Sequence, residues 1–107
     1  MGRYKIGVRS DFQPGKLYGI EVQGKNVMVV NLEGQIYAID GICGHHGGHL
    51  WDGKLEGGKV KCPSHGFEYD VRTGKLVGGH TRLFGKARDV EAYPIIFEGD
   101  DVLVELP

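Results

Sequence analysis

The chain has 107 residues, enough for one domain with a modest core. Its formal net charge of −1 at pH 7 argues against a polybasic nucleic-acid surface, and no apolar run is long enough to cross a membrane. Residues 1–6 lack the apolar stretch of a secretory signal. Both cysteines lie in motifs that suit metal binding, which leaves none for a disulfide, so we expect a cytoplasmic protein.

Short strands separated by turns are predicted along most of the chain. Alternating apolar residues, rich in valine, isoleucine and tyrosine, predict strands over 4–8, 17–22, 26–32 and 35–39. Further strands are predicted over 59–61, 67–71 and 75–77, and a last hairpin over 89–97 and 101–106. No helix is predicted. Frequent short strands with regular turns indicate an all-β fold, an antiparallel sandwich or barrel.

The middle of the chain has a different composition from its two ends. Alternation stops after residue 40, and 41–50 is expected to be a loop. Eleven of the 19 glycines lie between Gly41 and Gly79, and glycine permits both positive φ and close approach of the backbone to a ligand. We therefore expect one domain over 1–107, with an inserted metal-binding subdomain over about 41–80.

Two short motifs in this region pair a cysteine with a histidine. They are Cys43-Gly44-His45 and Cys62-Pro63-Ser64-His65, with 16 residues between them. A single spacer suits an extended loop, in which alternate side chains lean to one side, and two spacers suit a tight turn. Two such segments can hold one metal centre from opposite sides. Two cysteines with two histidines can bind a structural zinc ion or a [2Fe–2S] cluster of the Rieske type.

The motifs and the residues after them resemble the Rieske family, over nearly the whole chain. The pattern Cys-x-His, 16 residues, Cys-x-x-His is followed by Gly66 and by the aromatic-Asp-turn segment 69–74. The resemblance implies one [2Fe–2S] cluster, with the buried iron held by Cys43 and Cys62 and the outer iron by Nδ1 of His45 and His65. Neutral imidazoles make such a cluster less negative than an all-cysteine one, and therefore easier to reduce.

Departures from the family pattern indicate the subfamily. Rieske proteins of respiratory cytochrome bc complexes carry a further cysteine in each loop, where this chain has Gly48 and Ser64, and a serine where it has Phe67. In both respects the chain resembles Rieske-type ferredoxins, of the archaeal or the oxygenase-associated type. Tyr69 resembles the bc-type proteins instead, and the third loop, around His80, lacks a proline that many relatives carry.

Several other residues of this region have a functional and a structural interpretation. His46 could replace His45 as a ligand, since Cys43-x-x-His46 would mirror the second motif; the family pattern favours His45. His49 and His80 are expected to be surface or loop residues. Trp51 is expected to pack in the core rather than to carry electrons, and Phe67 to shield the cluster or simply to pack.

The resemblance implies a one-electron carrier, a ferredoxin that passes electrons from a reductase to an oxygenase or another acceptor. We expect a monomer without catalytic activity of its own, since the sequence shows no nucleophile–base pair and no nucleotide-binding loop. One alternative is a small Rieske-like subunit of a larger reductase, such as assimilatory nitrite reductase. Another is a zinc-stabilised interaction module without redox chemistry.

Overall fold

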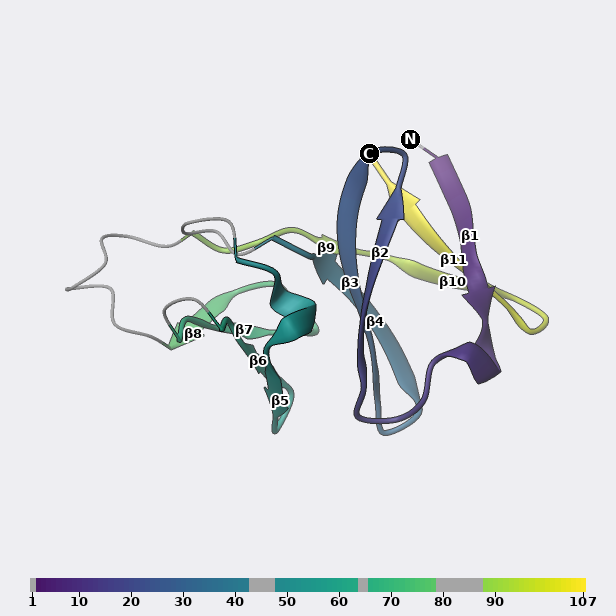
Figure 1. Ribbon diagram of the computed structural model, residues 1–107. Helices are drawn as coiled ribbons and strands as arrows, with labels where there is room; N and C mark the ends of the chain where they lie inside the picture. The colour runs from purple at the N-terminus through teal and green to yellow at the C-terminus, as the bar shows by residue number, and fades with distance from the viewer. Residues whose placement is uncertain (1, 43–47, 64–65, 79–87) are drawn as a thin grey trace.

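Three antiparallel sheets make up the computed structural model, which describes residues 2–42, 48–63, 66–78 and 88–107 (Figure 1). Two of them form a part that we call the base. One sheet has the order β1-β11-β10, with β1 over Gly2–Val8, β10 over Ile95–Glu98 and β11 over Asp101–Leu106. The other has the order β2-β3-β4-β9, with β2 over Leu17–Val22, β3 over Lys25–Leu32, β4 over Gln35–Asp40 and β9 over Ala92–Tyr93.

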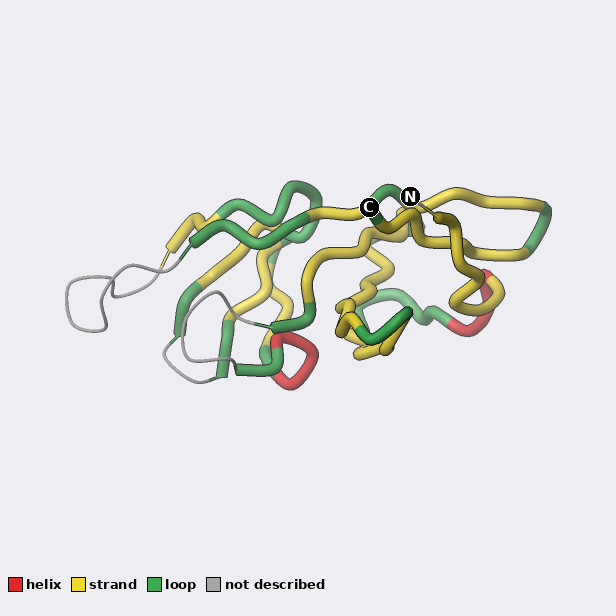
Figure 2. Tube along the Cα trace, turned by 90° about the horizontal axis from the view of Figure 1, so that it is seen from above, coloured by secondary structure: helices red, strands yellow, loops and turns green. Residues whose placement is uncertain are grey.

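The third sheet belongs to a part that we call the lobe, which lies to one side of the base (Figure 2). Its order is β5-β6-β7-β8, with β5 over Lys54–Glu56, β6 over Lys59–Lys61, β7 over Glu68–Asp70 and β8 over Leu76–Gly78. Two single-turn 3₁₀ helices complete the described elements: η1 (Arg9–Asp11) in the base and η2 (Leu50–Asp52) in the lobe.

Two tight turns set the register of the β2-β3-β4 meander. Val22 pairs with Lys25 and Leu32 with Gln35, so each hairpin has a two-residue loop. The four loop residues, Gln23-Gly24 and Glu33-Gly34, all have positive φ, between 52° and 91°. Positive φ at both central positions is the type I′ geometry, whose twist matches that of paired strands.

Strand β3 is buried on both faces and separates two hydrophobic cores. Val27 and Val29 point into the core of the base, between its two sheets, whereas Met28 and Val30 point into the core of the lobe. All four are fully buried, which explains the continuous apolar run at this point of the sequence. The lobe is thus packed against the outer face of the β2-β3-β4-β9 sheet.

The chain enters and leaves the lobe at one place on the base, where β4 pairs with β9. Tyr93 Oη donates a hydrogen bond of 2.5 Å to Asp40 Oδ1, and the Glu91 N–H donates one of 3.0 Å to Asp40 Oδ2. The Asp40 N–H donates in turn to the Glu91 carbonyl at 2.9 Å. Burial, and then the hydrogen bond to the Asp40 carboxylate, raise the pKa of Tyr93 far above its usual value. Tyr93 is therefore neutral. Its hydrogen bond joins β9, by which the chain returns to the base, to the end of β4, from which the chain enters the lobe.

The predicted all-β antiparallel fold is confirmed, with corrections to single elements. The strand predicted over 89–97 is two strands, because the chain changes sheets at Pro94, which has no N–H to donate. Strand β5 and the two 3₁₀ helices were not predicted, and β3 begins at Lys25, one residue before the strand predicted over 26–32. Among the described residues, no helix is long and apolar enough to span a membrane.

Candidate metal centre

Cys62 follows β6 directly and starts a closed turn. Its N–H donates to the Phe67 carbonyl at 2.7 Å, and its carbonyl accepts the Gly66 N–H at 3.0 Å. Gly66 has φ of +76°, a conformation that side chains disfavour, so glycine suits this position. Pairing of β6 with β7, in which Val60 lies opposite Tyr69, continues the turn as a hairpin. The second motif thus starts from rigid backbone.

The cysteine side chain lies in the core of the lobe. Cys62 is only 1% exposed and belongs to the same buried cluster as Phe67 and Tyr69, both fully buried. A thiolate is the ligand that iron–sulfur clusters take, and an apolar, water-free surrounding is what a buried iron requires. The position of Cys62 therefore fits the inner-iron ligand of the implied [2Fe–2S] cluster.

The first motif lies between two chain segments that meet. Ile42 and His49 form an antiparallel bridge, and the Leu50 N–H donates to the Gly41 carbonyl at 2.8 Å. The Gly41 N–H donates to the carbonyl of Asn26, in β3. These contacts join Gly41 and Ile42 to His49 and Leu50. We call these four residues the neck; they lie close to the end of β4.

Trp51 anchors this neck to the base. Its ring occupies space beside Gly19 of β2 and Gly41: an added Cβ would lie 2.3 Å from a ring atom at Gly19 and 2.5 Å at Gly41. The ring of His49 stacks on Trp51 at 4.5 Å between centroids, with 11° between the planes. The expected packing role of Trp51 agrees with its position against the lobe core. His49 lies on the surface, with Nδ1 3.6 Å from Asp52 Oδ2.

The structure describes one of the four predicted ligands. Cys62 is described, whereas Cys43, His45 and His65 fall outside the described residues, as do His46, Ser64 and His80. Within the described part of the chain no three histidine, cysteine or acidic side chains come together as a metal site. The full ligand set stays a prediction.

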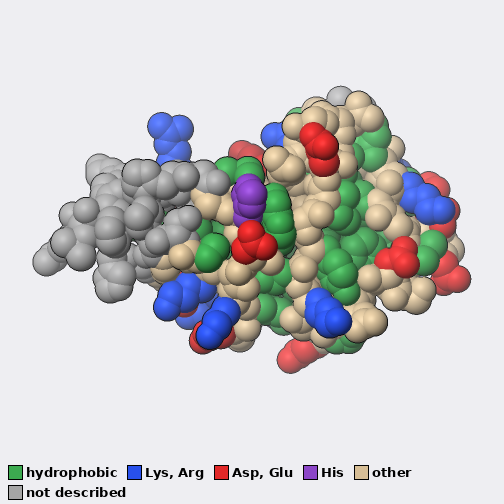
Figure 3. All heavy atoms as spheres, in the orientation of Figure 1, with side chains coloured by type: hydrophobic (Ala, Val, Ile, Leu, Met, Phe, Trp, Pro, Cys, Tyr) green, Lys and Arg blue, Asp and Glu red, His purple; other side chains and the backbone are tan. Residues whose placement is uncertain are grey.

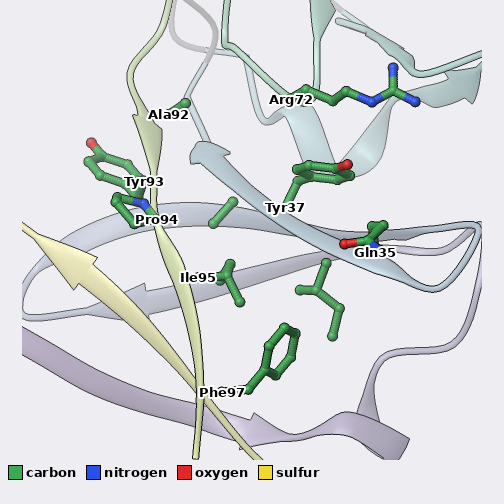
Figure 4. A pocket seen from close by; sticks show the side chains of 10 residues that line it. Gln35, Tyr37, Arg72, Ala92, Tyr93, Pro94, Ile95 and Phe97 are labelled. Atoms are coloured by element: carbon green, nitrogen blue, oxygen red, sulfur yellow. The ribbon is translucent and has the colours of Figure 1, made fainter.

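Two surface hollows border the lobe. One of about 350 Å³ adjoins the Cys62 turn and is lined by Asp52, Gly53, Lys54, Lys61, Cys62, Pro63 and Gly66. The other, of about 390 Å³, lies along β4 and the β9–β10 segment (Figure 4). There the guanidinium of Arg72, from the lobe, lies 5.8 Å from the ring centroid of Tyr37, a contact between lobe and base.

Three features of the site were not predicted from the sequence. The contacts of Gly19 and Gly41 with Trp51 and the Asp40–Tyr93 hydrogen bond depend on residues that are distant in sequence, and the high glycine content of 41–79 gave a signal for Gly41 alone. The position of Lys54 opposite Lys61 depends on β5, a strand that was not predicted.

Relatives of known kind match the chain along almost its full length. Residues 2–93 match the Rieske [2Fe-2S] domain. The ferredoxin component of the naphthalene 1,2-dioxygenase system of Pseudomonas putida is 34% identical over 91% of this chain and 88% of that protein. The ferredoxin component of biphenyl 2,3-dioxygenase from Rhodococcus jostii is 31% identical over 99% and 94%.

Solved structures agree. The ferredoxin of carbazole 1,9a-dioxygenase from Nocardioides aromaticivorans superimposes with a TM-score of 0.86, at 27% identity over 97% of both chains. Together with the buried Cys62 turn, these matches establish that the chain belongs to the Rieske [2Fe-2S] domain family.

Proposed function

We propose that this protein is a one-electron carrier that accepts electrons from a reductase and delivers them to a terminal oxygenase. The observation that carries the proposal is the match to ferredoxin components of dioxygenase systems, which spans almost the whole of both chains. A complex of oxygenase and ferredoxin in carbazole 1,9a-dioxygenase includes a chain that superimposes on this one with a TM-score of 0.84 at 25% identity.

The proposed ligand set is Cys43 and Cys62 on the inner iron and His45 and His65 on the outer iron. The bound cluster supplies reversible one-electron chemistry. The chain contributes the rest: burial of Cys62 excludes water, and its backbone hydrogen bonds with Gly66 and Phe67 hold the Cys62 backbone in place. The neck at Gly41 and Leu50 fixes where the first loop starts.

We also propose that residues 1–107 act as a single domain without catalytic activity, in the cytoplasm and as a monomer. The shared strand β3 supports the single domain, because its two faces belong to the two cores. The names of the relatives support the absence of catalysis, since each describes a component that serves an oxygenase.

Metal analysis and spectroscopy test the cofactor and its ligands. The protein purified from a native-like host should hold two irons and two acid-labile sulfides. Its reduced form should show an electron paramagnetic resonance spectrum whose average g-value lies below that of an all-cysteine cluster. Stoichiometric zinc without visible absorption would instead identify the zinc-stabilised interaction module.

Electron delivery is tested with a relative's oxygenase. The dithionite-reduced protein, freed of excess reductant, should pass one electron per molecule to the oxidised naphthalene dioxygenase oxygenase of Pseudomonas putida, followed by visible absorption. Bovine serum albumin treated in the same way is the blank. Co-purification of the native protein in a stable complex with a large reductase would favour the subunit alternative over the free carrier.

A further inference from the structure

Two lysines of the lobe face each other across a pair of strands. Lys54 of β5 lies directly opposite Lys61 of β6, and both side chains are exposed. Like charges in directly opposed positions destabilise a sheet. Glu68 of β7 lies opposite Lys61 on its other side, yet its carboxylate reaches diagonally to Lys59, with Oε2 3.8 Å from Nζ. Among the described residues, neither Lys54 nor Lys61 forms an ion pair.

The two lysines line the hollow that adjoins Cys62. The stem of Lys61 passes over the ligand turn, since a Cβ added at Gly66 would lie 3.3 Å from Lys61 Cε. Asp52 is the carboxylate among the lining residues, and it is exposed and faces His49 at 3.6 Å. The two cations outnumber it, so the hollow carries a net positive charge. Figure 3 shows lysine or arginine side chains in blue below and to one side of the histidine, with acidic side chains in red next to them.

We propose that Lys54 and Lys61 form an anion-docking site beside the Cys62 turn, which receives a carboxylate from an acidic surface of a redox partner. The proposal rests on the proposed carrier function and adds the charge of the partner surface. A carboxylate between the two ammonium groups removes their repulsion and brings the partner to the ligand turn. Two cations on a chain of net charge −1 suit an acidic protein surface better than the polyanionic backbone of a nucleic acid.

A charged small oxidant tests the site without knowledge of the partner. The reduced protein is mixed with hexacyanoferrate(III), an anion that takes up one electron and becomes hexacyanoferrate(II). At low ionic strength the Lys54→Gln/Lys61→Gln variant should react about fivefold more slowly than the unaltered protein, and added salt should abolish the difference. Oxidation by the cation tris(phenanthroline)cobalt(III) should not be slowed.

The matched control removes the same charge elsewhere. Lys5→Gln/Lys16→Gln takes two lysines from the base and should slow the hexacyanoferrate(III) reaction by less than half as much. A hexaglutamate peptide should inhibit the reaction of the unaltered protein but not that of the Lys54→Gln/Lys61→Gln variant. Midpoint potentials of all variants are measured, so that rates are compared at equal driving force.

Each contrary result has a distinct meaning. Equal rates in the two double variants at equal driving force, or no inhibition by hexaglutamate, would overturn the docking site. A lower unfolding temperature in Lys54→Gln/Lys61→Gln would also overturn it, since the lysines would then be structural; an unchanged or higher temperature is expected. Failure of the carrier function itself would show earlier, as the lack of a Rieske spectrum in the unaltered protein.

Discussion

At the scale of the residue, the two adjacent histidines of the first loop offer the sharpest test of the ligand set. We expect His45→Ala to abolish the cluster, because one coordination position of the outer iron is lost. We expect His46→Ala to retain it. Visible absorption and iron content of the purified variants measure the outcome. Loss in the His46 variant with retention in the His45 variant would reverse the assignment.

Tyr69 is fully buried in the cluster of residues that contains Cys62, so its hydroxyl group does not reach bulk water. We predict that this hydroxyl donates a hydrogen bond to a cysteine sulfur. Such a bond withdraws electron density and favours the reduced, more negative cluster. Tyr69→Phe keeps the ring, and its midpoint potential should be lower by some tens of millivolts, where about 59 mV corresponds to about 1.4 kcal/mol for one electron. An unchanged or higher potential in the folded variant would exclude the bond.

The sequence predicted roles for single residues better than it predicted their neighbours in the fold. The burial of Cys62 was implied by the resemblance to the Rieske family, and the packing role of Trp51 was expected from its place where the loop returns to the sheet. The contacts of the glycines beside Trp51 were not predicted, because β3 and β4 lie between Gly19 and Trp51 in the chain and the two residues become neighbours only in the fold.

At the scale of the element, the fit of Trp51 against β2 holds the neck of the first loop. Gly19→Ala would place a Cβ 2.3 Å from the Trp51 ring, so the ring must move. Overpacking of this kind costs about 1–3 kcal/mol in the free energy of unfolding. Chemical denaturation measures it. In a Trp51→Leu background the same change should cost far less, and an equal cost there would contradict the steric account.

The Asp40–Tyr93 bond predicts how stability depends on pH. The unfolded tyrosine loses its proton at about pH 10, whereas Tyr93 in the folded protein retains it to a higher pH. The unfolded state therefore releases a proton first, and the free energy of unfolding should fall as the pH rises above about 10. The fall should be smaller in Tyr93→Phe. Unfolding by urea between pH 8 and 11 measures both, and identical slopes would contradict the prediction.

The alternation of apolar residues predicted where most strands lie, but not which sheet each strand joins. The segment 89–97 looks continuous in sequence, and only Pro94 indicates the change from β9 to β10. Strand β5 was missed because three residues rich in charge give little periodicity.

At the scale of the whole molecule, β3 couples the lobe to the base. Because its residues 27–30 are fully buried between two cores, we expect one cooperative unfolding transition. Met28→Ala should lower the free energy of unfolding by about 2–5 kcal/mol and shift the loss of cluster absorption and of far-ultraviolet circular dichroism together. Val77→Ala, at a half-exposed side chain, is the control. Two separated transitions would show that lobe and base unfold independently.

The fold class was within reach of the sequence, since it follows from the spacing of the strands. The packing of the lobe on the outer face of one sheet was not, because a run such as Val27 to Val30 reports burial on two faces without saying what covers each.

The pairing of β1 with β11 also bears on how the chain folds during its synthesis. Gly2 lies opposite Leu106 and Val8 opposite Asp101, so β1 cannot pair until β11 has been synthesised. At about 5–20 residues per second, that wait lasts about 5–20 s. The meander β2-β3-β4 has local partners and can form meanwhile, whereas β1 remains an unpaired edge on the ribosome, open to chaperones and to wrong strands.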